Sequence, residues 1–586
     1  MKLKADNHDL DKLDKIIADE STHQAHLVSL IKHPSLLKQT WEPTKVMDEG
    51  KIPESLLPLE LLKKCLISDH RNVRLSPYHP RAWLGRAGTF LCLGFGDLAV
   101  ADAYRALTLV EIFLRFSEQT ERDRNADLKN PIASKVFSAV ITRVQMKNDD
   151  LPIHLNEVIP KIKSFAHDAF VIMATGLLRV RAFYDGLKVL KEAQKRFPTS
   201  RIIMTTLATI VTRLQHLREE CIGRLKSAEH VQREVTRGRV RKIAYPWIVP
   251  EEYTRSNNAI KRVKASFRSA SANAEIDYAP QDDDSINAYG VFACEDIFKG
   301  TRLLSDRSVF SATNVYNGKF CAACCGPINN GAITIDCCDT IFCCLGCHKD
   351  AMNNYHRILC GKDFTWMEDP SKKATGEYSH ALVPSLMLKI LATAVQQNTK
   401  PLRVTCVNTL DAGLGKNAVS SFTFYENVVA PTKILQSLGV DIFTDVRFDT
   451  WVLQMLFLRL ENNKQGSQTG KQTWCGLNPL FTMFNHDCDP AATWYSSNET
   501  GGGTLEVSAV RDIKKGDQIF VSYVDISLSE ETRRNAVQLY LGKICGCARC
   551  LREREDAAAG RKVAAEDIAA VANSIMTGLT LNDSDG

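Results

Sequence analysis

The segment from about residue 80 to residue 235 places its apolar residues at helical spacing. Its stretch AWLGRAGTFLCLGFGDLAVADAYRALTLVE interleaves small and large apolar residues, and the pair Gly96-Asp97 marks a turn. A second stretch, AFVIMATGLLRVRAFYDGLKVLKEAQKRFP, repeats this layout and is closed by Pro198. We therefore predict tetratricopeptide-like helix–turn–helix repeats of about 34 residues over 80–235, with an ordinary helical bundle as the alternative.

The segments on either side of these repeats carry weaker patterns. Residues 1–79 have no clear periodicity and are expected to form a partly flexible N-terminal region. Residues 236–284 are predicted to form a basic connector whose prolines and tryptophan indicate a packed, irregular path. Residues 551–586 are rich in alanine and predict a C-terminal helix followed by a tail.

The C-terminal half holds a set of short motifs in a fixed order. The stretch AYGVFACEDIFKGTRLL predicts a strand, a turn at Lys299-Gly300 and a second strand. Residues 361–470 are mostly helical in pattern. The segments LNPLFTMFNHDCDPAATW and GDQIFVSYVDISLSEETRRNAVQLYLGKICGCARC follow, and both are rich in residues that carry chemistry.

Cysteines are unevenly distributed along the chain. Of the 19 cysteines, nine lie between Cys321 and Cys360, and three more form a Cys-x-Cys-x2-Cys group from Cys545 to Cys550. In a reducing compartment such clustering predicts metal sites before disulfides. The isolated cysteines Cys65, Cys92, Cys221 and Cys406 are each expected to be small buried apolar residues.

Composition adds limits to this picture. Hydrophobic residues make up 44% and charged residues 24%, which is ordinary for globular proteins, and the formal net charge is +6. This charge is too small to favour direct nucleic-acid binding, and no recognition helix with clustered arginines accompanies the cysteines. The charged N-terminus and the lack of an 18-residue apolar run predict neither a signal peptide nor a membrane span. A nuclear or cytoplasmic location is therefore expected.

The order and wording of the C-terminal motifs resemble the SET and MYND domain protein lysine methyltransferases, especially the fungal and plant members with an N-terminal tetratricopeptide-like region. The resemblance covers about 285–550 and rests on the Asn-His-x-Cys-x-Pro, Ser-x-Tyr and Cys-x-Cys-x2-Cys motifs. It implies an α+β multidomain chain in which a MYND zinc module splits a mainly-β SET fold. The implied parts are an N-terminal SET part at 285–320, a MYND module at 321–360, a helical insert at 361–470, a SET core at 471–527 and a zinc-binding post-SET tail at 528–550.

The resemblance also implies an activity, the transfer of a methyl group from S-adenosylmethionine to a protein lysine. Tyr523 matches the family's catalytic tyrosine. The matching cofactor-binding residues are Gly290, Val291, Phe292, Asn485, His486 and Tyr523. Because free lysine titrates near 10.4, such an enzyme must also desolvate the target amine in an apolar channel.

Two to three zinc ions are implied as well. Cys488 with Cys545, Cys547 and Cys550 would form the post-SET site, a four-thiolate set that suits structural zinc. In the MYND module, Cys321, Cys324, Cys343 and Cys347 would form a complete first site. A second site would use Cys337, His356 and Cys360, but Thr334 stands at the expected fourth ligand position, and Cys338 is the open alternative. Cys325 and Cys344 are expected to lie outside both sites.

Three positions depart from the family pattern. Ala288 stands where the family usually has glycine, and Ala491 where it usually has asparagine. Lys543 stands where the family prefers an aromatic residue, a role that Tyr540 could fill instead. These departures favour an alternative, a weak or inactive adaptor that binds peptide partners through its repeats and its MYND module. The leading prediction remains a monomeric lysine methyltransferase acting on a histone or another protein.

Overall fold

The computed structural model describes the chain with gaps. The described residues are 59–118, 131–145, 155–224, 228–249, 252–279, 289–314, 320–328, 331–368, 382–415, 418–469, 472–496, 503–541 and 543–558. They fall into two compact units, the first made of 1–240, 361–401 and 421–457, the second of 241–360, 402–420 and 458–586. Three of the five boundaries between the units lie within the strands β1 (Gly238–Arg241) and β8 (Val419–Phe422) and the helix α17 (Thr450–Asn463).

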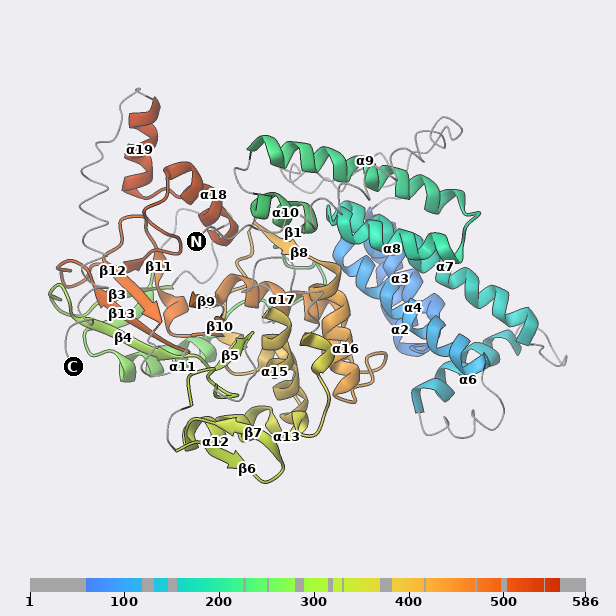
Figure 1. Ribbon diagram of the computed structural model, residues 1–586, viewed down its shortest axis with the longest axis horizontal. Helices are drawn as coiled ribbons and strands as arrows, with labels where there is room; N and C mark the ends of the chain where they lie inside the picture. Colours follow the sequence, from blue (N-terminus) through green and yellow to red (C-terminus); the bar gives the residue numbers. More distant parts are fainter. Residues whose placement is uncertain are drawn as a thin grey trace. The chain divides into compact units, whose positions relative to one another are not determined.

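The first unit is helical (Figure 1). Its helices are α2 (Leu59–Leu75), α3 (Pro80–Cys92), α4 (Gly96–Glu118), α6 (Pro131–Gln145), α7 (Leu155–Arg179), α8 (Phe183–Arg196), α9 (Arg201–Arg224), α10 (Ala228–Thr236), α15 (Val383–Gln396) and α16 (Ala430–Ser437). Helix α4 packs on α3 and α7, and α8 packs on α7 and α9. The helices expected over 80–235 are thus present wherever this range is described, while their assignment to tetratricopeptide repeats stays a prediction.

Most of the predicted helical insert at 361–470 belongs to this same unit. Buried charged side chains join the insert to the N-terminal helices. Arg86 of α3 is 2% exposed and pairs with Asp102 at 2.6 Å and with Asp449 at 2.7 Å. Arg105 of α4 donates hydrogen bonds to the carbonyl oxygens of Ile442 and Phe448 at 2.7 and 2.6 Å. Because buried guanidinium groups need such partners, the charges of α3 and α4 require the 442–449 segment in place.

The second unit combines small sheets with short helices (Figure 1). Its strands are β2 (Ala274–Tyr278), β3 (Tyr289–Ala293), β4 (Arg302–Arg307), β5 (Phe310–Thr313), β6 (Ile333–Ile335), β7 (Cys338–Phe342), β9 (Lys464–Thr469), β10 (Gln472–Leu477), β11 (Asn485–His486), β12 (Ala492–Ser496), β13 (Thr504–Ala509) and β14 (Phe520–Val521). Its helices are α11 (Asn257–Ala270), α12 (Leu345–Asn354), α13 (His356–Leu359), α18 (Glu530–Leu541) and α19 (Ala548–Ala558). The sheets are β12-β13-β4, β5-β10-β9, β2-β3, β11-β14 and β6-β7.

Two local predictions have clear outcomes here. The predicted strand–turn–strand unit is confirmed, since β3 and β4 flank a turn in which Gly300 has a φ of +85°. The expected irregular connector is more regular than predicted. Its polar segment forms α11, which buries Val263 and Phe267, and β2, which pairs with β3. The helix was not predicted because only four of its residues form the buried apolar stripe, and the rest of its surface is largely polar and basic.

The core of the second unit lies between these sheets. It joins buried residues of β2, β3, β4 and β13, such as Val291 and Leu505, to Phe484, which precedes β11, and to Val521 of β14. The core therefore fixes the short strands β11 and β14, whose residues carry the predicted chemistry.

No α-helix in the described ranges is long and apolar enough to cross a membrane.

Candidate active site and metal sites

Three short strands bring the predicted cofactor and catalytic residues together. β11 pairs in parallel with β14, so Asn485 lies opposite Phe520 and His486 opposite Val521. The amide of Ile519 donates to the carbonyl oxygen of Val291 in β3 at 2.8 Å. Gly290, Asn485 and the segment leading to Tyr523 thus converge, although they are far apart in sequence.

Gly290 lies against two amide side chains. A Cβ atom at this position would lie 2.1 Å from Nε2 of Gln518 and 3.1 Å from Nδ2 of Asn485. Asn485 donates through Nδ2 to the carbonyl oxygen of Tyr289 at 3.1 Å. The glycine is therefore required for close approach, and the amides line a cradle beside its backbone.

Gln518 shows that this cradle suits a polar ligand. Its Nε2 is buried and has no hydrogen-bond acceptor among the described residues. An unpaired buried amide donor costs about 1–3 kcal/mol, so an acceptor group from a ligand would remove a penalty. The cofactor S-adenosylmethionine, which offers carboxylate and ring-nitrogen acceptors, fits this requirement.

Tyr523 follows β14 and is held at two atoms. Its backbone N–H donates to Nδ1 of His486 at 3.0 Å, and its hydroxyl donates to the carbonyl oxygen of Phe484 at 2.7 Å. Burial raises the pKa of the Tyr523 phenol above its ordinary value of 10.0. The phenol is therefore neutral, and its oxygen lone pairs can accept weak C–H hydrogen bonds.

The side chain of His486 has two protein partners. Its Nδ1 accepts the Tyr523 amide, and its Nε2 lies 3.3 Å from the sulfur of Cys488. Burial lowers the pKa of this histidine to about 4, so the ring is neutral. Its side chain is directed to Tyr523 and to the cysteine cluster that contains Cys488. Contact between the His486 backbone and the cofactor stays a prediction, and so does contact of the backbones of Val291 and Phe292 with the cofactor.

The C-terminal cysteines form the predicted four-thiolate group. The sulfurs of Cys488, Cys545, Cys547 and Cys550 all lie within 4.8 Å of one another, and Cys550 is 3.5 Å from Cys488. A tetrahedral zinc with bonds of about 2.3 Å would separate its sulfurs by about 3.8 Å. The cluster therefore fits zinc.

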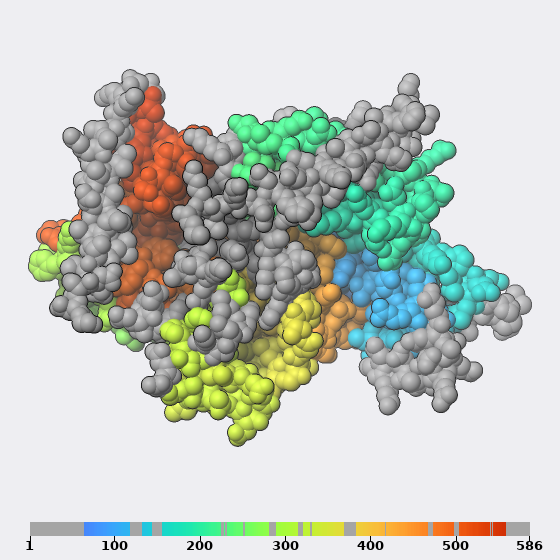
Figure 2. Space-filling model, in the orientation of Figure 1, coloured from blue at the N-terminus to red at the C-terminus, as the bar shows by residue number. Residues whose placement is uncertain are grey.

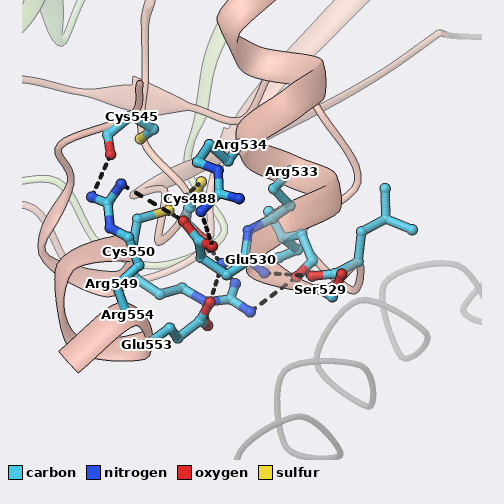
Figure 3. Close-up of polar contacts among 12 residues, drawn as sticks. Cys488, Ser529, Glu530, Arg533, Arg534, Cys545, Arg549, Cys550, Glu553 and Arg554 are labelled. Carbon is cyan, nitrogen blue, oxygen red and sulfur yellow. Dashed lines mark hydrogen bonds and ion pairs between the residues drawn. The ribbon is translucent and has the colours of Figure 1, made fainter. Parts of the chain in front are cut away.

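Arginines surround this C-terminal group (Figure 3). Arg549 donates to the carbonyl oxygen of Cys488 at 2.9 Å, and Arg554 donates to that of Cys545 at 2.9 Å. Arg533, with a side chain only 1% exposed, lies 3.9 Å from the Cys550 sulfur and is ion-paired with Glu553. These cations offset the negative charge that four thiolates would place on the site.

The cysteine-rich module at 320–360 holds two further groups, and part of it (yellow-green) lies at the surface in Figure 2. The first group contains Cys321, Cys324, Cys343 and Cys347 as predicted. Cys343 lies 3.7 Å from Cys324 and 3.4 Å from Cys347, sulfur to sulfur. Arg307 of β4 donates to the Cys347 sulfur at 2.6 Å, so this site is tied directly to the neighbouring sheet.

The second group resolves the open ligand of the sequence. Cys337, Cys338, His356 and Cys360 converge, and both adjacent sulfurs lie 3.6 Å from Nε2 of His356. This is the separation of about 3.6 Å that a tetrahedral zinc imposes on a sulfur and a nitrogen. Thr334 is exposed on β6, outside the group. Cys337 lies in the turn before β7, and its sulfur lies on the same side as that of Cys338.

The three departures have different outcomes. Ala288 lies outside the described residues, as does the side chain of Tyr540. Ala491 is 6% exposed within the core, and its carbonyl oxygen accepts from Val510 at 2.9 Å. Lys543 is exposed. In the described residues neither Ala491 nor Lys543 disturbs the cradle at Gly290.

Sequence reasoning missed several residues of these sites. Gln518 stands in no motif, and only its place two residues before β14 could have marked it. Cys338 is visible in the sequence, but its position next to Cys337 argued against it as a ligand. Arg533 and Arg549 resemble residues of an ordinary charged helix. Arg549 stands next to Cys550, which is a signal that could have shown it as a partner of the metal site, whereas Arg533 has no such signal.

The part of the chain that carries these sites is similar to known proteins. The family model for the SET domain matches residues 288–524. The chain is 30% identical over 108 residues to a SET and MYND domain-containing protein of Dictyostelium discoideum, covering 17% of this chain and 31% of that protein. It is 34% identical over 82 residues to a histone-lysine N-methyltransferase of Homo sapiens, covering 14% of this chain and 18% of that protein.

A third relative is the SET domain and MYND-type zinc finger protein 6 of Schizosaccharomyces pombe, 32% identical over 101 residues, with 17% of this chain and 20% of that protein covered. The matched part thus spans between 18% and 31% of the length of these relatives. The family model includes Gly290, Asn485, His486 and Tyr523 in its range.

Proposed function

The chain belongs with the SET and MYND domain proteins, and we propose that it is a protein lysine N-methyltransferase that uses S-adenosylmethionine. The observation that carries the proposal is the convergence of Gly290, Asn485 and Tyr523 through the parallel pairing of β11 with β14. The relatives named as histone-lysine N-methyltransferases support the reaction class. Nothing in the described residues specifically favours a non-catalytic adaptor.

S-adenosylmethionine supplies the methyl group and its sulfonium leaving group. The residues that would hold it are Asn485 and Gln518, through their side-chain amides, and the backbone of 290–292. Gly290 lets the Gln518 amide lie directly beside this backbone. Of these residues, Gln518 is assigned because its buried amide nitrogen lacks a partner among the described residues, and not because it matches the family pattern.

Tyr523 would orient the reacting groups. Its hydroxyl proton is committed to the Phe484 carbonyl oxygen, so the phenol oxygen can act as an acceptor rather than as an acid. The surrounding core residues, including Phe481 and Trp494, exclude water. In such surroundings a substrate lysine is expected to become neutral without a dedicated base, because desolvation disfavours its charged form.

The test of this proposal is methyl transfer by Tyr523→Phe. We expect at least about a 100-fold loss of kcat on core histones or ribosomal proteins, the usual size of losing one positioned polar group in an active site. Binding of S-adenosylmethionine in a calorimeter should persist in this variant and be lost in Asn485→Ala. Tyr495→Phe is the matched control, since Tyr495 is 51% exposed on β12.

Two results would contradict the proposal. Folded, zinc-loaded wild-type protein that binds no S-adenosylmethionine would exclude the reaction. Full activity of Tyr523→Phe would exclude the assigned mechanism.

The remaining expectations are part of the same proposal. The substrate is a protein with a target lysine, and the helical repeats and the MYND module offer surfaces for peptide partners. Thiolate-based metal groups suit a reducing compartment, so we propose action in the nucleus or the cytoplasm, as a monomer.

A further inference from the structure

His486 bridges the candidate catalytic tyrosine and a metal-binding cysteine. The β11–β14 ladder ends with the amide of Asp487 donating to the carbonyl oxygen of Val521 at 3.0 Å. Two residues beyond Val521, the amide of Tyr523 donates to a side chain, the Nδ1 atom of His486, at 3.0 Å.

The tautomer of this histidine follows from its partners. Nδ1 faces an N–H donor, so it must carry a lone pair, and the ring proton therefore sits on Nε2. Nε2 lies 3.3 Å from the sulfur of Cys488. A thiolate in a metal site is a good acceptor for such a donor, so the imidazole is fixed at both ends.

Cys488 is itself placed by the other three cysteines. Cys545, Cys547 and Cys550 come from the C-terminal tail and meet Cys488 within 4.8 Å. Without a metal, four thiol groups have no strong reason to stay together. The position of the imidazole, and with it the acceptor for the Tyr523 amide, then depends on whether this site is filled.

We propose that His486 is a positioning residue that couples metal occupancy of the C-terminal four-cysteine site to the placement of Tyr523. One consequence of this inference rests on the proposed function: metal loss at this site should weaken cofactor binding. Since coupling between two sites is reciprocal, the bound cofactor should also strengthen metal binding there.

Neighbouring contacts hold the residues on either side of the Tyr523 amide. The indole Nε1 of Trp494 donates to the carbonyl oxygen of Ser522 at 3.0 Å, and the hydroxyl of Tyr523 is held by Phe484. The strand segment before Tyr523 is therefore anchored independently of the metal. The cysteine cluster is connected to this segment at the Tyr523 amide, through the imidazole of His486.

The test uses a double-mutant cycle on the full-length, zinc-loaded protein. A fluorotyrosine placed at position 523 by amber suppression reports the surroundings of this ring by fluorine NMR. Cys547→Ser weakens the C-terminal site by removing one thiolate. His486→Asn keeps a side-chain oxygen near the Nδ1 position for the Tyr523 amide but is too short to reach Cys488.

We expect Cys547→Ser to shift or broaden the resonance in the wild-type background and to cause no further change in the His486→Asn background. Cys360→Ser, which weakens a metal site of the cysteine-rich module, should leave the resonance in place. Equal effects of Cys547→Ser in both backgrounds, no effect in either, or the same shift from Cys360→Ser would overturn the proposal.

A calorimetric titration with S-adenosylhomocysteine separates this inference from the proposed function. We expect Cys547→Ser to weaken binding about tenfold in the wild-type background and much less in the His486→Asn background. If wild-type protein does not bind S-adenosylhomocysteine but the NMR cycle gives the expected result, the proposed function fails and the coupling stands. If binding is equal in Cys547→Ser and wild type, the coupling does not reach the cofactor site, and this part of the proposal is wrong.

Discussion

Replacing Gly290 by alanine should weaken cofactor binding far more than it destabilises the fold. The new Cβ would lie 2.1 Å from Nε2 of Gln518, whereas an ordinary contact needs about 3.5 Å, so the amide must retreat by roughly 1.4 Å. The end of a glutamine side chain can move this far, and we expect a loss of only about 1–2 kcal/mol in the free energy of unfolding. Asn485, 3.1 Å from the same Cβ, must also give way.

The binding loss follows from the displaced amides. Two hydrogen bonds to the ligand at about 1 kcal/mol each amount to about 2 kcal/mol, or about a 30-fold rise in the Kd for S-adenosylmethionine. The assay is a calorimetric titration paired with denaturant unfolding of each variant. Gly300→Ala is the matched control. Its φ of +85° makes an alanine strained by about 1–2 kcal/mol, yet no other atom lies within 4 Å of the added Cβ.

Gly300→Ala should therefore lose stability and keep its Kd. If Gly290→Ala binds S-adenosylmethionine as tightly as wild type does, the cradle assigned to Gly290, Asn485 and Gln518 is wrong. If both variants lose binding in proportion to stability, the effect reports folding rather than the site.

Two further outcomes follow from other residues. Burial raises the pKa of Asp306 from 3.8 to about 7, so the folded protein holds a proton that the unfolded chain releases, and the stability from this carboxyl is full below about pH 4 and is lost as the pH rises towards 7. Asp306→Asn, whose oxygen can accept the same amides of Leu480 and Phe481, should gain stability over wild type at pH 8 but not at pH 4 in urea unfolding; an equal difference at both pH values would refute this assignment. Cys338→Ser should lower the zinc content by one ion in native mass spectrometry while Cys344→Ser leaves it unchanged, and a full zinc content in Cys338→Ser would return the fourth ligand position to doubt.

The sequence predicted those features that depend on short spacing. The Cys-x-Cys-x2-Cys group, the turn at Lys299-Gly300 and the helices over 80–235 are encoded locally, and the structure contains each of them. The sequence leaves the ligand role of Cys338 open because a strand directs consecutive side chains to opposite faces. The turn that holds Cys337 removes this restriction, and no pattern of apolar residues records it.

Features that depend on pairing between distant segments could not be predicted from the residues alone. Gln518 becomes part of the cradle because β14 pairs with β11, and because the amide of Ile519 is bonded to β3. Nothing in its immediate neighbours specifies either contact. The direction of the His486 ring is similar, since the motif places this histidine next to Asn485 but does not say which residues its nitrogens meet.

The tail that carries the C-terminal cysteines has little apolar burial of its own, so we expect its order to depend on metal. Among the described residues, its own buried cluster consists of Val537 and three cysteines, with Val524 and Cys547 partly buried beside them. Burying one valine contributes about 1.5–3 kcal/mol, which does not offset the conformational entropy lost by ordering a segment of this length. A structural zinc contributes about 10–16 kcal/mol of apparent binding free energy in small zinc domains. Metal binding would thus stabilise the tail several-fold more than apolar burial does, and the contact of His486 with Cys488 would join Tyr523 to this metal site.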